Sequence, residues 1–224
     1  MSSDIIAAIS SVIGDVPRPV ALHEPLFAGN ENAYVKSCID EGWVSSVGAF
    51  VNRFEKDLAA FCGAPRAVVV VNGTCAIHAA LMVLGVQPGD EVIIPALTFV
   101  ATANAAVHAG AVPHFVDVEE TSLGMDPQAL QSHLERVASS QGGQTVNKLT
   151  GRPNRALMPV HIFGHPCRLE ELAAIAREWN LVLVEDATEA LGSTQDGRPV
   201  GNRHTAVFSF NGNKMVTTGG GGAV

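Results

Sequence analysis

Short apolar runs alternate with helix-like segments along most of this chain, and this alternation constrains the fold more than any other feature. Strand-like runs rich in β-branched residues occur at 66–71, 90–95, 112–118 and 181–186. Short connections and helix-like segments separate them, which predicts an α/β fold with a mainly parallel central sheet flanked by helices. The run at 66–71, "RAVVVV", is typical of a strand that is buried on both faces.

The remaining segments complete this pattern. Helical spacing of apolar residues predicts helices at 31–41, 50–61, 74–85, 99–110, 126–139 and 169–180, and further strands are expected at 155–163 and 206–210. The polar, glycine-bearing stretch 141–154 is expected to be an inserted loop. Residues 1–30 are expected to form a lead-in with a short amphipathic helix around 5–13, followed by one large domain over 31–224.

Composition excludes several function classes. The chain is 47% hydrophobic and 16% charged, so it can bury a sizeable core, and its net charge of −8 disfavours nucleic acid or an anionic membrane as a partner. The most apolar stretch, 67–86, is interrupted by polar residues and is not expected to span a membrane. The four cysteines show no CxxC pair, and no secretory signal opens the chain, so reduced thiols in a cytoplasmic protein are expected.

The predicted topology indicates where a ligand would bind. In open α/β sheets, ligands lie beyond the carboxyl ends of the strands. The segments that follow the predicted strands are Gly73-Thr74, Pro95 to Phe99, His161 to His165, Asp186 to Glu189, and Asn211 to Lys214. We therefore expect any functional site to be built from these segments.

Three residues in these segments could carry chemistry, each with a plainer alternative. Thr74, in "NGTC", opens a helix whose free N–H groups suit a phosphate, or it is simply a helix cap. Asp186 could pair with a cationic nitrogen, although a turn-capping Asp fits equally well. Lys214 lies among apolar and small residues that favour a nucleophilic amine, although most lysines are solvated charges.

Other polar residues fit standard sites poorly. His161 and His165 are four residues apart, but Gly164 and Pro166 disfavour a helical metal pair, so hydrogen-bonding loop residues and no metal site are expected. Ser209 lacks a G-x-S-x-G elbow, which argues against a hydrolase triad, and a dinucleotide-binding glycine fingerprint is also missing. Glu185 is expected to face outward or to make a structural contact.

Four motifs in order resemble one family. "NGTCAIHAAL", "PALTFVATANAAVHAGAVPHFVDV", "VEDATEALGS" and "FSFNGNKMVTTGGGG" are similar to the DegT/DnrJ/EryC1/StrS sugar aminotransferases, from about Pro25 to the last residue. These enzymes use pyridoxal 5′-phosphate (PLP) and have the fold type I large domain. "EGWVSSVG" and the four glycines, in place of G-E-G-G, look most like the legionaminic acid and bacillosamine-type 4-aminotransferases.

The resemblance implies a role for each site residue. Lys214 matches the lysine that bonds covalently to PLP and later moves a proton, and Asp186 matches the carboxylate that faces the pyridine nitrogen. Phe99 matches the aromatic residue stacked on the ring. The phosphate cradle is matched by Gly73, Thr74 and Ser209, with Cys75 contributing at most a backbone N–H. Glu189 lies where relatives place Gln, His or Glu close to the ring.

The implied function is transfer of an amino group from an amino acid, usually glutamate, to the C4 keto group of a nucleotide-linked 4-keto-6-deoxy sugar, with UDP favoured as the nucleotide. Such reactions serve cell-surface glycan biosynthesis, and the resemblance also implies a cytoplasmic homodimer. The lysine rather than histidine at 214 favours transamination over dehydration. The alternative is a catalytically silent protein that senses a sugar nucleotide.

Family enzymes continue well past the lysine, so the resemblance implies that this chain is truncated after the lysine motif, without the C-terminal small domain. We therefore expect an incomplete large domain, with a strand after "GGGGAV" missing from the sheet interior and apolar surface exposed. These residues alone are expected to bind the cofactor poorly and to turn over little.

Overall fold

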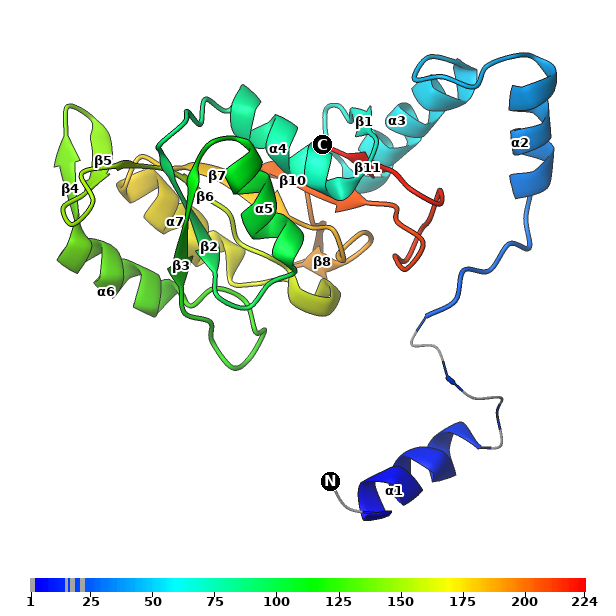
Figure 1. The fold of residues 1–224 in the computed structure, drawn as a ribbon, viewed down its shortest axis with the longest axis horizontal. Coiled ribbons are helices and arrows are strands. Elements are labelled where there is room, and N and C mark those ends of the chain that lie inside the picture. Colours follow the sequence, from blue (N-terminus) through cyan, green and yellow to red (C-terminus); the bar gives the residue numbers. More distant parts are fainter. Residues whose placement is uncertain (1–2, 15, 17–18, 21–22) are drawn as a thin grey trace.

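A mainly parallel sheet runs through the centre of the computed structural model, which describes residues 3–14, 16, 19–20 and 23–224 (Figure 1). The strand order is β1-β11-β10-β7-β6-β2-β3. The strands are β1 (Val69–Val70), β2 (Glu91–Pro95), β3 (Val112–Val116), β6 (Pro153–Leu157), β7 (Val182–Asp186), β10 (Thr205–Ser209) and β11 (Gly222–Ala223). The pairings from β10 to β3 are parallel, whereas β11 is antiparallel to both of its neighbours. The predicted α/β fold is confirmed.

Helices cover both faces of this sheet because buried strand residues alternate between them. Val92 and Ile94 of β2 pack with α4 (Gly73–Val83) and α5 (Val100–His108). Ile93 faces the other way, toward α6 (Pro127–Val137) and α7 (Leu169–Glu178). Asp126 caps α6 by accepting the backbone N–H groups of residues 128 and 129, as its position before a proline predicts.

The strand expected at 66–71 differs most from its prediction. Only Val69–Val70 pairs in the sheet, and it pairs with β11 at the edge. Val68 and Val71 are 56% and 69% exposed, so the expectation of burial on both faces is wrong. An edge strand has a neighbour on one side only, which an apolar run by itself does not reveal.

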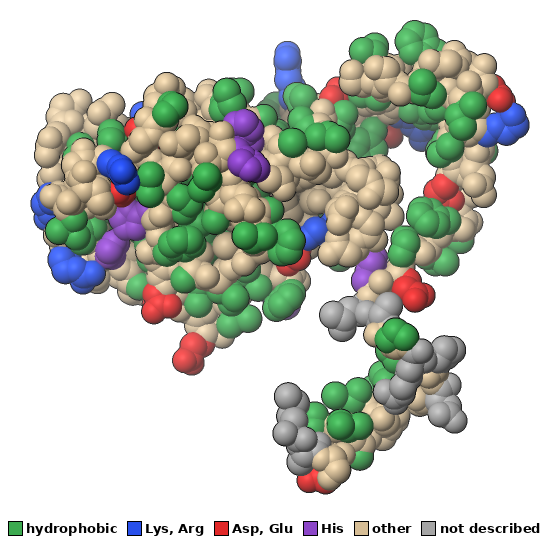
Figure 2. Space-filling model, viewed as in Figure 1, with side chains coloured by type: hydrophobic (Ala, Val, Ile, Leu, Met, Phe, Trp, Pro, Cys, Tyr) green, Lys and Arg blue, Asp and Glu red, His purple; other side chains and the backbone are tan. Residues whose placement is uncertain are grey.

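The N-terminal helices lie outside the main body of the fold. The predicted lead-in helix is present as α1 (Ser3–Ile13), which stands apart in Figure 1, and α2 (Glu31–Asp40) follows it. Neither helix contains a buried residue, and their hydrophobic side chains are visible at the surface in Figure 2. Helix α3 (Ala49–Cys62) is the first to pack on the sheet, through Leu58 and Cys62. Part of the extended lead-in, residues 15, 17–18 and 21–22, lies outside the described residues.

The expected loop at 141–154 is instead a β-hairpin. Strands β4 (Ala138–Gln141) and β5 (Gln144–Asn147) pair antiparallel, and β5 continues onto β6. Gly142 and Gly143 have φ values of 58° and 79°, which a two-residue hairpin turn requires and glycine adopts without strain. Polar residues therefore form this hairpin because turn geometry, rather than apolar burial, specifies it.

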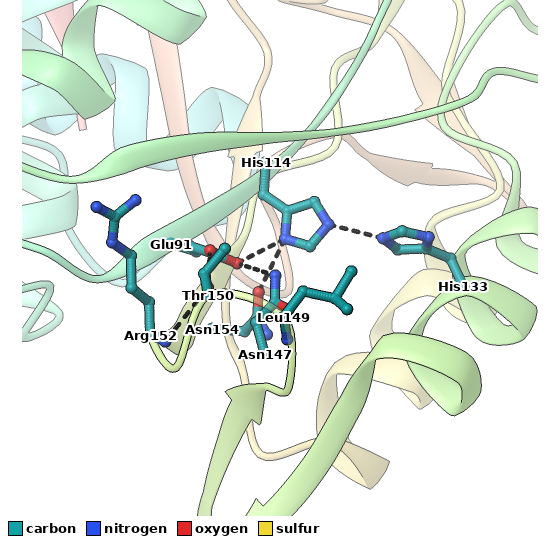
Figure 3. A network of polar contacts seen from close by, with 8 residues as sticks. All are labelled: Glu91, His114, His133, Asn147, Leu149, Thr150, Arg152 and Asn154. Carbon is teal, nitrogen blue, oxygen red and sulfur yellow. Dashed lines mark hydrogen bonds and ion pairs between the residues drawn. The ribbon is translucent and has the colours of Figure 1, made fainter.

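A polar network fastens this hairpin to the sheet (Figure 3). Glu91 is 3% exposed, and its carboxylate accepts hydrogen bonds from Asn147 at 2.9 Å and from Thr150 at 2.7 Å. His114 lies 2.8 Å from the same carboxylate and 2.7 Å from the ring of His133 on α6. One buried carboxylate thus joins β2, β3, α6 and the end of the hairpin, at the sheet edge where β2 begins.

The C-terminal glycines lead into a short strand, β11, that the sequence analysis did not predict. β11 occupies the interior position between β1 and β10, whereas the strand expected to be missing would follow Val224, so that expectation stays a prediction. β8 (Thr194–Gln195) and β9 (Arg198–Pro199) form a separate small hairpin. None of the helices in the described part of the chain is long and apolar enough to cross a membrane. All four cysteines, which fall among the described residues, are free thiols.

Candidate active site

The carboxyl end of β7 places a buried carboxylate at the ligand-facing edge of the sheet. Asp186, the last residue of β7, is 2% exposed. Its Oδ1 accepts the backbone N–H of Thr188 at 3.2 Å, and its Oδ2 accepts the hydroxyl of Thr102 at 2.7 Å. Two donors from different segments therefore hold both oxygens of this carboxylate.

Lys214 approaches the same segment from the loop after β10. Its Nζ lies 3.1 Å from Oε1 of Glu189, three residues beyond Asp186. The other oxygen of Glu189 accepts the backbone N–H of Phe163 at 3.0 Å. Gly164 makes this contact possible, because a Cβ at that position would lie 2.8 Å from the Glu189 carbonyl oxygen. The predicted nucleophile and carboxylate thus lie at one edge of the sheet.

Near these residues, Gly73 packs closely against the side chains of Ser209 and Thr188. A Cβ on Gly73 would lie 3.0 Å from the Cβ of Ser209 and 3.2 Å from Cγ2 of Thr188. The structure therefore brings together two of the predicted phosphate-binding residues, Gly73 and Ser209, although 136 positions separate them in the sequence. Thr188 connects this convergence to Asp186.

The start of α4 differs in detail from its prediction. The helix begins at Gly73, and its cap is Asn72, whose side chain accepts the N–H of Cys75 at 2.8 Å. The Cys75 N–H, the most that this residue was expected to contribute to a phosphate site, is bonded to the Asn72 side chain in this structure. Thr74 is not the cap and lies half-buried in the first turn.

Phe99 stands at the start of α5. It is the residue that precedes the first turn of this helix, and its side chain is 72% exposed. Three residues later in the same helix, Thr102 contacts Asp186. The rigid helix therefore ties the position of the exposed ring to that of the buried carboxylate.

Two residues that contact Asp186 were missed by the sequence analysis. Thr102 lies in a stretch recognisable only as helix, and its partner is 84 residues away. Thr188 acts through its backbone N–H, which no residue type signals. A buried polar residue in the first turn of a helix at the ligand-binding edge is the one signal that could have indicated Thr102.

The residues set aside in the sequence have structural roles. His161 is 1% exposed; its Nε2–H donates to Glu185 at 3.1 Å and its Nδ1 accepts the N–H of Cys167. Glu185 is fully buried, so the structural contact is confirmed and the outward orientation is wrong. Among residues 3–14, 16, 19–20 and 23–224, no group of three His, Cys, Asp or Glu side chains could hold a metal ion.

An apolar pocket lies away from the candidate site. It has a volume of about 830 Å³, lies between α2, α3 and the β1 edge, and contains none of the predicted site residues. Its walls are mainly apolar, including Tyr34, Val35, Ile39, Trp43, Phe50 and Phe54. Since no lysine is among its lining residues, the candidate site remains the edge at Asp186 and Lys214.

Comparisons with solved structures show that aminotransferases share this fold. The crystal structure of 3-amino-5-hydroxybenzoic acid synthase is similar over 92% of this chain and 50% of that one, with 33% identity and a TM-score of 0.78. The putative sugar aminotransferase Spr1654 from Streptococcus pneumoniae, in its PLP form, is 28% identical over 91% of this chain and 52% of that one, with a TM-score of 0.78.

The sequence is also similar to those of curated sugar aminotransferases. GDP-perosamine synthase from Caulobacter vibrioides is 40% identical over 213 residues, 95% of this chain and 53% of that protein. The Vibrio cholerae enzyme of the same name is 41% identical over 92% of this chain and 52% of that protein. The chain thus spans about half the length of these relatives. The model of the DegT/DnrJ/EryC1/StrS aminotransferase family matches residues 26–224, and the chain belongs to this family.

Proposed function

We propose that this protein is a PLP-dependent aminotransferase that moves an amino group from glutamate to the C4 keto group of a nucleotide-linked 4-keto-6-deoxy sugar, for cell-surface glycan biosynthesis. The observation that carries the proposal is the placement of Lys214 and buried Asp186 at one edge of the sheet, where Lys214 pairs with Glu189, three residues beyond Asp186. Family membership supports the same reaction class.

The residues at this edge fit PLP in four respects. Lys214 offers a primary amine for the aldehyde carbon, and its side chain is only 16% exposed. Asp186 offers a carboxylate for the pyridine nitrogen. Gly73 in the first turn of α4 lies against the side chain of Ser209, so a phosphate could contact both the backbone at the start of this helix and the Ser209 hydroxyl. Phe99 is exposed and free to stack on a ring.

PLP, when bound, supplies an electron sink for the carbon that loses or gains a proton. The chain's own residues prepare that chemistry. Asp186 holds a proton on the ring nitrogen, because a carboxylate beside a nitrogen favours its charged form. Lys214 would hold the cofactor through Nζ and, once released from it, would take up and return a proton at the same nitrogen. Thr188 and Thr102 keep the Asp186 carboxylate in one orientation.

The proposal also concerns which nucleotide the sugar substrate carries. The motif resemblance favours UDP, whereas the perosamine synthases among the relatives make a GDP-linked sugar by name. We infer that GDP and UDP sugars are the two substrates to test first. A cytoplasmic homodimer is proposed as the setting, and light scattering of the purified protein tests the dimer.

The experiment is borohydride reduction of the protein with PLP, followed by peptide mapping. The proposal expects the label on Lys214, its loss in Lys214→Ala, and its retention in Lys148→Ala, a matched variant on the hairpin. A label elsewhere or none would refute the cofactor assignment. Glutamate should then change the visible absorbance of the bound cofactor, whereas the silent sensor would bind without that change.

A further inference from the structure

The carboxylate of Asp186 is held by a chain of two hydroxyl groups. Thr102 is 1% exposed, and its Oγ1 lies 2.7 Å from Asp186 Oδ2. The hydroxyl of Thr98 lies 2.7 Å from the hydroxyl of Thr102. Thr98 thus extends the contact from the buried carboxylate toward the start of α5.

The direction of these hydrogen bonds follows from counting protons. A threonine hydroxyl has one hydrogen to donate. Thr102 donates it to Asp186, so Thr102 must accept the hydrogen of Thr98. A hydroxyl that accepts one hydrogen bond is a stronger donor in the next, so Thr98 reinforces the bond from Thr102 to the carboxylate.

The contact comes from an element separate from the strand that carries Asp186. Thr102 belongs to the first turn of α5, whereas the other donor to Asp186, the N–H of Thr188, belongs to the turn after β7. The local turn therefore secures one oxygen, and only the distant helix secures the other. Without the Thr102 hydroxyl, the carboxylate would be free to rotate about the remaining bond.

We propose that Thr102, supported by Thr98, is a positioning residue that fixes the Asp186 carboxylate for the pyridine nitrogen of PLP. This inference rests on the proposed function. Helix α5 would then have two roles. It would position Phe99 against the face of the PLP ring, and through Thr102 it would orient the Asp186 carboxylate that contacts the ring nitrogen.

The test compares three variants of the protein. Thr102→Val keeps the shape and removes the hydroxyl, whereas Thr102→Ser keeps the hydroxyl. Thr145→Val is the matched control, because Thr145 is 2% exposed and its hydroxyl bonds the Trp179 carbonyl, far from Asp186 in the sequence and on the hairpin. The readouts are the PLP dissociation constant and the pH dependence of the absorbance of bound PLP, which reports the protonation of the ring.

Thr102→Val is expected to weaken PLP binding about tenfold, equal to about 1.4 kcal/mol, and to shift the pH profile. Thr102→Ser should restore both, and Thr145→Val should lower the thermal midpoint while leaving both unchanged. If Thr102→Val binds PLP with the wild-type affinity and pH profile, or changes them no more than Thr145→Val, the inference is wrong.

A second measurement separates this outcome from failure of the proposed function. If the wild-type protein binds no PLP, the proposed function fails for this chain, and unfolding midpoints then decide the inference. Thr102→Val and Asp186→Ala should be strongly non-additive in the double variant, because each removes one partner of the same contact. Additive shifts would overturn the positioning role even with no cofactor bound.

Discussion

Lys214 Nζ lies 3.1 Å from Glu189 Oε1, so the amine proposed to bind PLP is paired with a carboxylate. The second oxygen of Glu189 accepts the backbone N–H of Phe163. Glu189 therefore bridges the turn after β6 and the loop that carries Lys214. The Glu189 side chain is 37% exposed, so solvent screens the ion pair and the bridge contributes more to geometry than to stability.

Removing this bridge should loosen the turn at Phe163. In Glu189→Ala the Phe163 N–H loses a charged acceptor worth about 1.5 kcal/mol, so its hydrogen exchange should accelerate roughly tenfold. Glu189→Gln keeps an acceptor oxygen and should change the rate far less. NMR-detected exchange checks both, with the Asp186 amide, bonded to the Pro159 carbonyl, as internal control. Equal rates in wild type and Glu189→Ala would show that the bridge does not form in solution.

Gly164 should be sensitive to substitution for the same reason. It has φ +80°, and an added Cβ would lie 2.8 Å from the Glu189 carbonyl oxygen. Gly164→Ala should therefore lower the free energy of unfolding by about 2–3 kcal/mol, of which about 1 kcal/mol is backbone strain. Gly197→Ala is the control, since Gly197 has φ +73° with nothing within 4 Å of its added Cβ. Urea denaturation measures both, and equal losses would contradict a close approach at Gly164.

The parallel core of the fold was predictable because a strand that is buried on both faces has a continuous run of apolar residues. All residues of β2, "EVIIP", are buried. The helices that flank the sheet begin and end within a few residues of their predicted bounds. The hairpin β4–β5 was not predictable, since its polar residues are held by Gly142-Gly143 turn geometry and by Glu91. β11 is two residues long and begins at the last of four glycines, and its pairing depends on β1 and β10 rather than on its own composition.

The site was predictable where it obeys the strand-end rule. Asp186 ends β7 and Lys214 lies in the loop after β10, and the structure places them at the same edge. Thr102 was not predicted because a threonine in a helix has no sequence pattern that marks a functional role. Its hydrogen bond to Asp186 depends on how α5 packs against β7. Position relative to the sheet is thus readable from sequence, whereas the hydrogen bonds that orient a side chain are not.

The network around Glu91 has one consistent arrangement of protons (Figure 3). Arg136 always donates, so Nδ1 of His133, 3.0 Å away, must accept. His133 therefore donates from Nε2 to His114, which donates from Nδ1 to Glu91. Burial and the charges of His114 and Arg136 lower the pKa of His133. Burial alone raises the pKa of Glu91, but the hydrogen bonds from Thr150, Asn147 and His114 outweigh it and lower that pKa.

Both shifts predict a loss of stability in acid. The stability that neutral His133 contributes is present above its ordinary pKa of 6.5 and is lost as the pH falls through its lower folded value. The stability from ionised Glu91 is present above 4.5 and is lost below it. The free energy of unfolding should fall by about 1 kcal/mol between pH 7 and pH 5, the net worth of one hydrogen bond. Urea titrations should show a flatter profile in His133→Gln, and an unchanged one in His108→Gln, an exposed histidine of α5.

Gly222 should tolerate no side chain, because β11 passes directly over the turn that opens α4. An added Cβ would lie 2.4 Å from the carbonyl carbon of Asn72 and 2.7 Å from the backbone nitrogen of Gly73, atoms that cannot rotate away. Gly222→Ala should therefore destabilise the protein by more than about 2 kcal/mol, the upper range for overpacking a tight site. Gly212→Ala, with nothing within 4 Å of its added Cβ, should cost less than about 1 kcal/mol. Thermal and urea unfolding compare the two.

Gly73 also borders Ser209, so any backbone shift that relieves the clash at Gly222 must move the proposed phosphate cradle. A Gly222→Ala protein that unfolds and binds PLP like the wild type would therefore contradict both the register of β11 and the proposed cradle.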